Sequence, residues 1–160
     1  MGSGTNRPVD WERVVFENEN RLYRAALAIL ADGVEAEDAV QETFLKFLEK
    51  RPALDGPEHE RRWLMRVLVN GCKNRLRAAW RRKTVPLDEA FAMASVDERR
   101  ELEELMTLPV KERTVIHLHY YEGYKTAEIA QILGEAEGTV RSRMSRARAR
   151  LRTLLAEEEL

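Results

Sequence analysis

The sequence predicts an all-α protein of two small helical domains joined by a linker, with a helix-turn-helix in the second domain. Apolar residues recur at steps of three and four along most of the 160 residues, which is typical of helices that bury one face. No stretch shows the sustained apolar–polar alternation of a half-buried strand. Breakers rich in glycine and proline divide the periodic stretches into two blocks.

The first block, residues 9–83, is predicted to hold three helices. Apolar periodicity runs through residues 14–30, returns through 39–48 and appears again through 63–76. The breakers between them are Ala31-Asp32-Gly33 and Arg51 to Pro57. A left-handed residue or a proline at such positions ends one helix and allows another to begin.

The second block, residues 97–157, follows a weakly patterned linker at 84–96. In KTAEIAQILGEAEGTVRSRMSRA, Thr126 is predicted to cap one helix and Thr139 to cap the next. Gly134 supplies the left-handed residue between them. The second helix is predicted to bury an apolar seam formed by Val140, Met144, Ala147, Leu151 and Leu154.

Charge is strongly segregated although the formal net charge is only −1. Residues 10–60 carry 13 acidic and six basic side chains, whereas residues 61–83 carry nine basic side chains and no acidic one. Residues 141–152 hold six arginines and no acid. Solvated helix faces usually mix both signs, so two acid-free stripes indicate two contacts with a polyanion. The alternative is that the stripes are only solvated helix faces.

The second helix of the helix-turn-helix has the chemistry of a DNA recognition helix. Arg141 and Ser142 lie in its first turn, where side chains reach base edges, and later arginines suit phosphate contacts. A plain two-helix hairpin is the alternative. The candidate DNA-binding residues of this domain are Thr126, Thr139, Arg141, Ser142, Ser145, Arg146 and Arg148.

Three motifs in register resemble the extracytoplasmic-function (ECF) sigma factors of bacterial RNA polymerase. They are DAVQETFLKFL, RRWLMRVLVNGCKNRLR and LPVKERTVIHLHYYEGYKTAEIAQILGEAEGTVRSRMSRARARL. The resemblance implies that the first domain binds core polymerase and opens the downstream (−10) promoter element, while the second reads the upstream (−35) element. The implied partners are the two largest polymerase subunits, promoter DNA and an anti-sigma factor.

The resemblance also implies residue roles. The matching polymerase-binding positions are Asp38, Gln41, Glu42 and Phe44. The matching −10 positions, with neighbouring cations and aromatics, are Leu54, Trp63, Asn70, Asn74, Arg75, Arg77, Trp80, Arg81 and Arg82. The helical spacing of Trp63 with Val67 is more typical of a core residue, whereas Trp80 suits DNA contact and packing equally. The chain departs from the family's pattern at Leu54, Asn74 and Glu135, where an aromatic, an Asp and an apolar residue are usual.

Other function classes are disfavoured by the sequence. It contains no nucleophile–base constellation and no glycine-rich phosphate loop, so neither an enzyme nor a cofactor is predicted. His117 and His119 are two apart on a predicted helix, hence on different faces, and do not form a metal site. The lone Cys72, with no apolar run of spanning length, favours a reducing cytoplasm and no membrane insertion.

Two alternatives to a promoter-specificity subunit remain open. A sigma-like decoy would sequester an anti-sigma factor and would not need the arginine stripes. A polymerase-independent helix-turn-helix regulator would bind its operator alone.

Overall fold

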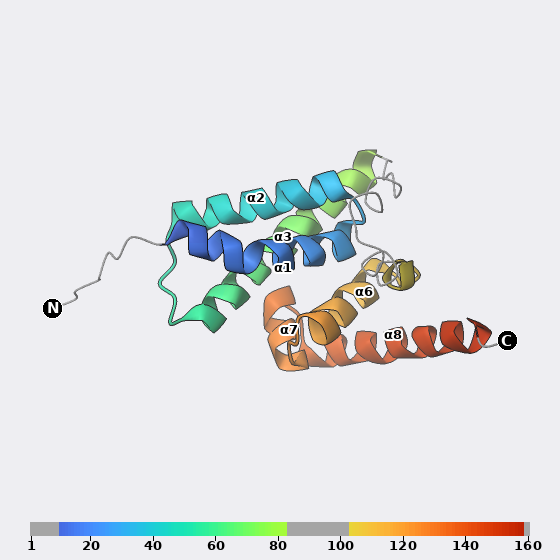
Figure 1. The fold of residues 1–160 in the computed structure, drawn as a ribbon. Coiled ribbons are helices and arrows are strands. Elements are labelled where there is room, and N and C mark those ends of the chain that lie inside the picture. The colour runs from blue at the N-terminus through green and yellow to red at the C-terminus, as the bar shows by residue number, and fades with distance from the viewer. Residues whose placement is uncertain (1–9, 83–102, 159–160) are drawn as a thin grey trace.

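The computed structural model describes residues 10–82 and 103–158, and within these ranges it contains helices and turns but no strand (Figure 1). The elements are α1 (Trp11–Leu30), α2 (Gly33–Lys50), α3 (Pro57–Arg82), α6 (Val110–Ile116), the π-helix η1 (His117–Tyr121), α7 (Thr126–Leu133) and α8 (Glu137–Glu158). The predicted all-α class is confirmed. The predicted boundary at residue 9, the linker at 84–96 and the start of the second domain at 97 lie outside the described residues.

The junction between α1 and α2 shows how the sequence ends one helix and starts the next. Ala31 takes the left-handed conformation (φ 55°), and its N–H donates to the Leu27 carbonyl at 2.9 Å. Asp32 then accepts hydrogen bonds from the N–H groups of Val34 at 2.9 Å and Glu35 at 3.1 Å. This N-cap satisfies donors that have no partner inside α2. The predicted breaker is confirmed.

The first three helices pack against one another as a three-helix unit. Its fully buried side chains include Val14, Leu22, Ala26, Leu64, Leu68 and Cys72. At one end of the unit, the Trp11 ring meets Phe44 edge-on at 5.6 Å and stacks near Phe47 at 6.3 Å. The Phe47 ring in turn meets Trp63 edge-on at 5.8 Å. Aromatic contacts therefore close the end of the core where α3 begins.

The second unit is built from α6, η1, α7 and α8. The π-helix η1 continues directly from α6, and the Glu122 N–H donates to the His117 carbonyl at 3.1 Å, a five-residue step. Val140, Met144 and Ala147 of α8 are buried, and Leu151 and Leu154 are half-buried. The predicted apolar seam is confirmed.

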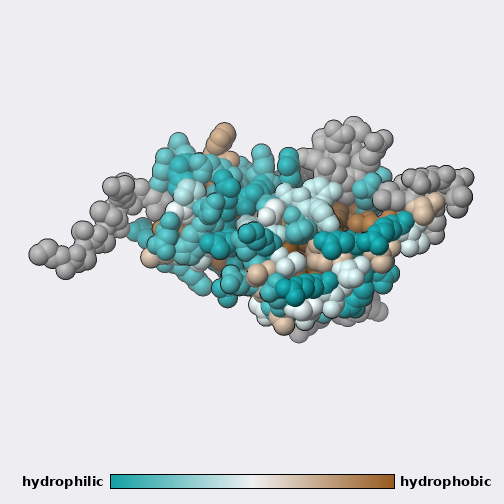
Figure 2. All heavy atoms as spheres, turned by 90° about the horizontal axis from the view of Figure 1, so that it is seen from below, coloured by the Kyte–Doolittle hydropathy of each residue, from teal (hydrophilic) through white to brown (hydrophobic). Residues whose placement is uncertain are grey.

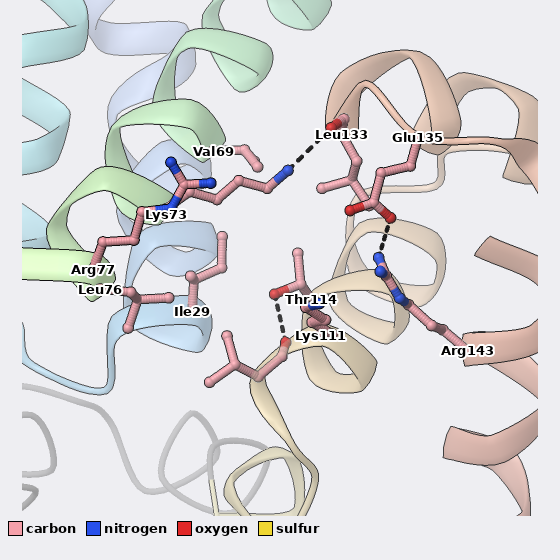
Figure 3. Close-up of a pocket in the computed structure, with 11 residues that line it drawn as sticks. Ile29, Val69, Lys73, Leu76, Arg77, Lys111, Thr114, Leu133, Glu135 and Arg143 are labelled. Atoms are coloured by element: carbon pink, nitrogen blue, oxygen red, sulfur yellow. Dashed lines mark hydrogen bonds and ion pairs between the residues drawn. The ribbon is translucent and has the colours of Figure 1, made fainter. Parts of the chain in front are cut away.

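The two units pack directly on each other, with α7 against α3 and α6 against α1 (Figure 1). The buried Arg113 of α6 donates to the carbonyls of Ala28 and Ile29, each at 2.7 Å, at the end of α1. In the opposite direction, Lys73 of α3 donates to the Leu133 carbonyl at 3.0 Å, at the end of α7 (Figure 3). Each unit therefore caps a helix of the other.

A second polar contact joins the units beside Arg113. Arg21 of α1 donates to the Tyr124 hydroxyl at 3.1 Å and lies 3.6 Å from the Glu122 carboxylate.

Burial lowers the pKa of Arg113, but arginine ionises so far above neutrality that the group stays charged. No carboxylate of the described residues pairs with Arg113, so the contact rests on backbone carbonyls.

Cys72 lies inside the first unit with none of its surface exposed. Burial raises the pKa of its thiol from 9.0 to about 12. The thiol is therefore neutral and shielded in the folded protein, as expected for a packing residue rather than a reactive one.

We predict that Cys72 makes stability depend on pH above 9. Between 9.0 and about 12 the thiol ionises in the unfolded chain but not in the folded one. The free energy of unfolding should therefore fall by about 1 kcal/mol per pH unit in that window, relative to Cys72→Ala. Chemical denaturation of both proteins from pH 7 to 11 measures the difference. Parallel pH curves would contradict the prediction.

Candidate nucleic-acid and partner interfaces

The outer face of α8 carries most of the residues predicted to bind duplex DNA. Hydrophilic residues cover most of the surface on the side of α7 and α8 (Figure 2). Arg141, Ser142, Ser145 and Arg146 are exposed, opposite the buried seam. Arg141 donates to Glu137 at 2.7 Å, whereas Arg146 reaches only the backbone carbonyl of Ser142 at 3.4 Å. The start of α8 therefore presents cations to solvent.

Besides Arg141, three more of the six arginines of α8 are held by side-chain contacts within the second unit. Arg143 pairs with Glu135, and Arg150 lies 2.9 Å from the buried carboxylate of Glu112. Arg148 donates to the Tyr120 hydroxyl at 2.8 Å, with its guanidinium 5.7 Å from the centre of that ring. Tyr120 is 56% exposed and was not among the predicted residues. The structure thus places Arg148 on an aromatic platform at the edge of the face.

The two predicted N-caps of the helix-turn-helix are wrong. The N-cap of α7 is Lys125, whose N–H donates a hydrogen bond to the Glu128 carboxylate at 3.2 Å. Thr126 is the first residue of α7, and its hydroxyl donates to Glu137 at 3.1 Å. Thr139 is the third residue of α8, because that helix already begins at Glu137. Glu137, the first residue of α8, accepts hydrogen bonds from the side chains of both Thr126 and Arg141.

One face of α3 presents polar residues to solvent. Asn70, Asn74 and Arg77 follow at steps of four and three, and all three are exposed. Arg66, four residues before Asn70, extends the same face and was not among the predicted site residues. The helix continues to Arg82. The predictions for Trp80, Arg81 and Arg82 concern side chains outside those that the structure describes.

Two residues predicted to contact −10 DNA lie against the core instead. Trp63 is half-buried and contacts Phe47, and Leu54 also packs against the core. The helical spacing of Trp63 favoured this position. Trp63 also lines an open pocket of about 220 Å³ together with His59, Arg62 and Arg66.

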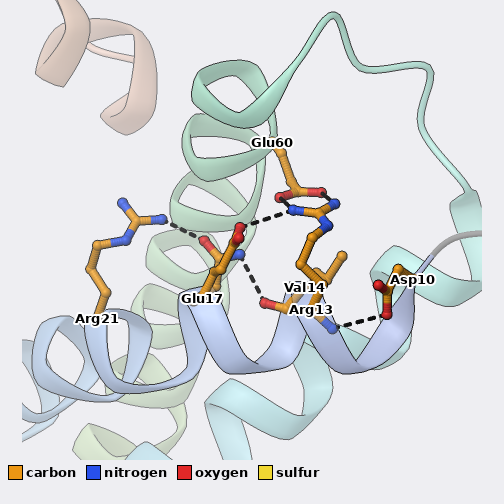
Figure 4. A network of polar contacts seen from close by, with 7 residues as sticks. Asp10, Arg13, Val14, Glu17, Arg21 and Glu60 are labelled. Atoms are coloured by element: carbon orange, nitrogen blue, oxygen red, sulfur yellow. Dashed lines mark hydrogen bonds and ion pairs between the residues drawn. The ribbon is translucent and has the colours of Figure 1, made fainter.

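The acidic first turn of α3 is partly neutralised by α1 (Figure 4). Glu60 accepts hydrogen bonds from Arg13 at 3.1 and 3.4 Å, and Arg13 also reaches Glu17 at 2.9 Å. The hydrogen bond with Glu60 is the main reason that the pKa of Arg13 is raised. Glu60 therefore orients the start of α3 and does not add negative charge to the DNA-facing surface.

The exposed face of α2 carries the predicted polymerase-binding residues, with one exception. Asp38, Gln41 and Glu42 are exposed on a shared face, as expected from their spacing. Phe44 is only 6% exposed and packs on Trp11, so in this structure it supports α2 from the core. Leu45 and Leu48, which were not predicted, are 57% and 41% exposed on the solvent side.

Arg75 links the face of α2 to the basic helix α3. Its guanidinium lies 2.7 Å from Glu35 and 2.9 Å from Glu42. The hydrogen bond from Arg75 is the main reason that the pKa of Glu42 is lowered. Arg75 was predicted to bind DNA, but here it is committed to two carboxylates. It positions Glu42 within the α2 face.

A cation-rich cavity of about 330 Å³ lies between the two units (Figure 3). Its walls are apolar, and its rim carries Lys73, Arg77, Lys111 and Arg143 with the single acid Glu135. Burial lowers the pKa of Lys73, and nearby cations act in the same direction. Within the described residues, neither Arg77 nor Lys111 has a hydrogen-bond or ion-pair partner. The cavity is therefore an anion-attracting part of the basic surface.

The two histidines do not converge on a metal. His117 lies 3.2 Å from Glu122, whereas His119 lies 2.8 Å from the Tyr124 carbonyl. Among residues 10–82 and 103–158, no group of three or more His, Cys, Asp or Glu side chains is placed to hold a metal ion. In the same ranges, no helix combines the length and apolarity needed to cross a membrane.

Family models match both units. The model described as "Sigma-70 region 2" matches residues 14–82, and that described as "Sigma-70, region 4" matches residues 99–151. The ECF RNA polymerase sigma factor SigM of Mycobacterium tuberculosis is 34% identical over 152 residues, covering 91% of this chain and 76% of that protein. The RNA polymerase sigma factor SigV of Bacillus subtilis is 28% identical over 151 residues, covering 91% of each chain.

Two solved structures are similar in fold to this chain over most of its length. The sigma factor RpoE of Bartonella quintana, in complex with the anti-sigma factor NepR, gives a TM-score of 0.73 at 26% identity, covering 92% of this chain and 97% of that one. CnrH, in complex with the cytosolic domain of CnrY, gives a TM-score of 0.67 at 27% identity, covering 92% and 88%.

The family-model matches, the relatives and the fold agree with the three motifs of the sequence. Proteins of this family regulate transcription and are not enzymes. The chain belongs to the ECF sigma factors of the sigma-70 family.

Proposed function

We propose that this sigma factor binds core RNA polymerase through α2, reads the −35 element with α8 and holds the melted −10 element along α3. The observation that carries the proposal is the separation of three exposed faces on three different helices. The faces of α8 and α3 are cationic or polar, and the face of α2 is acidic with exposed leucines. A protein that must contact DNA at two places and a protein partner at a third needs this division.

The α2 face fits a basic protein surface. Asp38 and Glu42 supply negative charge, and Leu45 supplies an apolar contact between them and the end of the helix. Arg75 holds Glu42 in place, which reduces the side-chain entropy lost on binding. Polymerase contact through this face leaves α8 on the other unit available to DNA.

Duplex recognition fits the first turns of α8. Arg141 and Ser142 are exposed there, and an arginine fork suits guanine in the major groove. Arg146 is exposed one turn later, without an acidic partner among the described residues. Arg148 on Tyr120 is oriented for phosphate contact at the edge of the face.

The exposed face of α3 fits single-stranded DNA. Asn70 and Asn74 offer amide groups to unstacked bases, while Arg66 and Arg77 can follow the backbone. We also place Trp80, Arg81 and Arg82 on this path by sequence alone. The cavity rim at Lys73 and Lys111 continues the positive surface toward the second unit.

In the packed arrangement the two units lie too close together to contact both promoter elements at once. Elements centred near −35 and −10 lie about 25 base pairs apart, or about 85 Å along the duplex. Because α7 packs directly on α3, both elements cannot be read until the units separate. We therefore propose that the free chain binds promoter DNA weakly and that core polymerase favours the separated state.

The proposed partners place the chain in the bacterial cytoplasm, where polymerase and chromosomal DNA meet. One similar sigma factor, RpoE of Bartonella quintana, has been solved with the anti-sigma factor NepR. We extend that class of partner to this chain, which offers acidic and apolar surface on α2 for it.

Transcription in vitro tests the proposed function directly. Core polymerase and this chain are added to a library of genomic fragments, and transcripts that depend on the chain are mapped. Promoter-dependent initiation supports the proposal. A decoy would add no transcripts, and a polymerase-independent regulator would bind its operator equally well without polymerase.

We predict that Arg141→Ala and Arg146→Ala each weaken upstream promoter binding by about 1–3 kcal/mol, because each removes an exposed cation from the α8 face. Affinity is measured with saturating core polymerase on a promoter from the library. Arg24→Ala removes the same charge from α1 and serves as the control. Unchanged affinity in both α8 variants would favour the decoy.

We predict that Arg113→Ala loosens the packing of the two units. The change removes two short hydrogen bonds to the end of α1, which contribute about 1–3 kcal/mol. The equilibrium between packed and separated units should therefore shift toward the separated state by about 5- to 150-fold. Small-angle scattering should show an expanded free protein with unchanged helicity. Lys111→Ala, an exposed residue on the same helix, is the matched control. Equal compactness of both variants would contradict the prediction.

A further inference from the structure

Residues of both units line the cavity of about 330 Å³ that lies between them (Figure 3). Ile29 and Lys73 belong to the first unit, and Lys111 and Arg143 belong to the second. The volume lies in the range of about 300–1,000 Å³ that is typical of small-molecule pockets. A molecule bound there contacts both units at once, so its binding depends on how the units are packed.

Apolar side chains from four helices contribute to the lining of the cavity. They are Ile29 of α1, Val69 and Leu76 of α3, Val110 of α6 and Leu133 of α7. All five are buried or half-buried. Because contact with such side chains is favourable for an apolar group and not for a hydrated inorganic ion, the lining favours an organic ligand.

Four cationic side chains line the same cavity with a single carboxylate. Glu135 is already paired with Arg143. Lys73 donates to a backbone carbonyl at 3.0 Å. Arg77 and Lys111 are exposed, and no residue within 10–82 and 103–158 pairs with either of them. The cavity therefore carries an excess of positive charge.

Packing of the units brings cations together across the boundary. Lys73 and Arg77 lie on α3, whereas Lys111 lies on α6 and Arg143 on α8. Burial is the main reason that the pKa of Lys73 is lowered; Glu135 acts against the shift, and the other three cations act with burial. An anion between the units offsets a repulsion that exists only while they are packed.

The two cations without a partner among the described residues suit a phosphate group. The guanidinium of Arg77 can donate two parallel hydrogen bonds to phosphate oxygens, and the ammonium of Lys111 supplies a compact charge. Promoter DNA also offers phosphates, but the proposed separation of the units on the promoter removes the cavity and frees its cations for the DNA path along α3. A ligand of the packed state is therefore a separate, smaller molecule.

We propose that the cavity binds a small phosphate ester with an aromatic or other apolar body. Cations of both units, Arg77 and Lys111, hold the phosphate, and the apolar side chains of the lining hold the body. The ligand binds the packed chain and not the separated one, so by mass action it holds the units together and opposes promoter binding. This regulatory consequence rests on the proposed separation of the units, whereas the site itself does not.

Fluorescence titration of naphthyl phosphate with the free full chain tests the site. The probe should bind saturably, whereas uncharged naphthol and inorganic phosphate should each need at least about tenfold higher concentrations, because each lacks one half of the ligand. Lys111→Gln and Arg77→Gln should each raise the dissociation constant at least about tenfold. Lys50→Gln, the same change at an exposed lysine of α2 outside the cavity, should leave it unchanged.

Three outcomes of the titration overturn the inference. Equal binding to the unchanged chain and all three variants would show an adventitious additive only. Inorganic phosphate as effective as naphthyl phosphate would show that the apolar lining is not used. A short oligothymidylate that occupies the site at lower concentration than naphthyl phosphate would assign these cations to DNA in the packed state as well.

Transcription in vitro separates this inference from the proposed function. Saturating naphthyl phosphate should reduce the transcripts that depend on the chain at least about fivefold, and Lys111→Gln should lose most of that sensitivity relative to its own transcripts without the probe. If the probe binds but transcript levels stay the same, the ligand does not hold the units together and the regulatory step is overturned. If the chain directs no transcription at all, the proposed function fails, while the titration still decides whether the site exists.

Discussion

The relation between the two units depends on cationic side chains that cap helix ends across the boundary. The last carbonyls of a helix have no partner within it, and a buried unsatisfied carbonyl costs about 1–3 kcal/mol. Arg113 satisfies the end of α1, and Lys73 satisfies the end of α7. Arg113 meets only backbone carbonyls, whereas Lys73 also lies near the Glu135 carboxylate. Because the desolvated cation receives only partial compensation, the packed state is held but can be released.

Contacts of other arginines within each unit explain how a nearly neutral chain presents separate cationic and acidic surfaces. Arg143, Arg148 and Arg150 on α8 are engaged inside the second unit, so the dense arginine run also stabilises the helix-turn-helix. Arg141 and Arg146 remain exposed. On the first unit, Arg75 holds the acidic face of α2 instead of meeting DNA. Intramolecular pairing thus sorts the charges into separate surfaces.

Local features of the fold could be predicted from the sequence, whereas the partners of its charges could not. The breaker at Ala31–Gly33 and the seam of α8 depend on neighbouring residues and were predicted correctly. The cap predicted at Thr126 lies one residue earlier, at Lys125, and the cap predicted at Thr139 lies three residues earlier, because α8 begins at Glu137. Phe44, Leu54 and Trp63 pack on the core through contacts between helices. Arg113 meets carbonyls 84 and 85 residues away, which no local pattern reveals.

The distance between the two units in the free and promoter-bound states tests the account most directly. Spin labels at Lys50→Cys and Ala127→Cys, both exposed positions, report that distance while the buried Cys72 stays unlabelled. The account predicts one short distance for the free chain and one longer by tens of ångströms with core polymerase and promoter DNA. An unchanged distance in the assembled complex would contradict it.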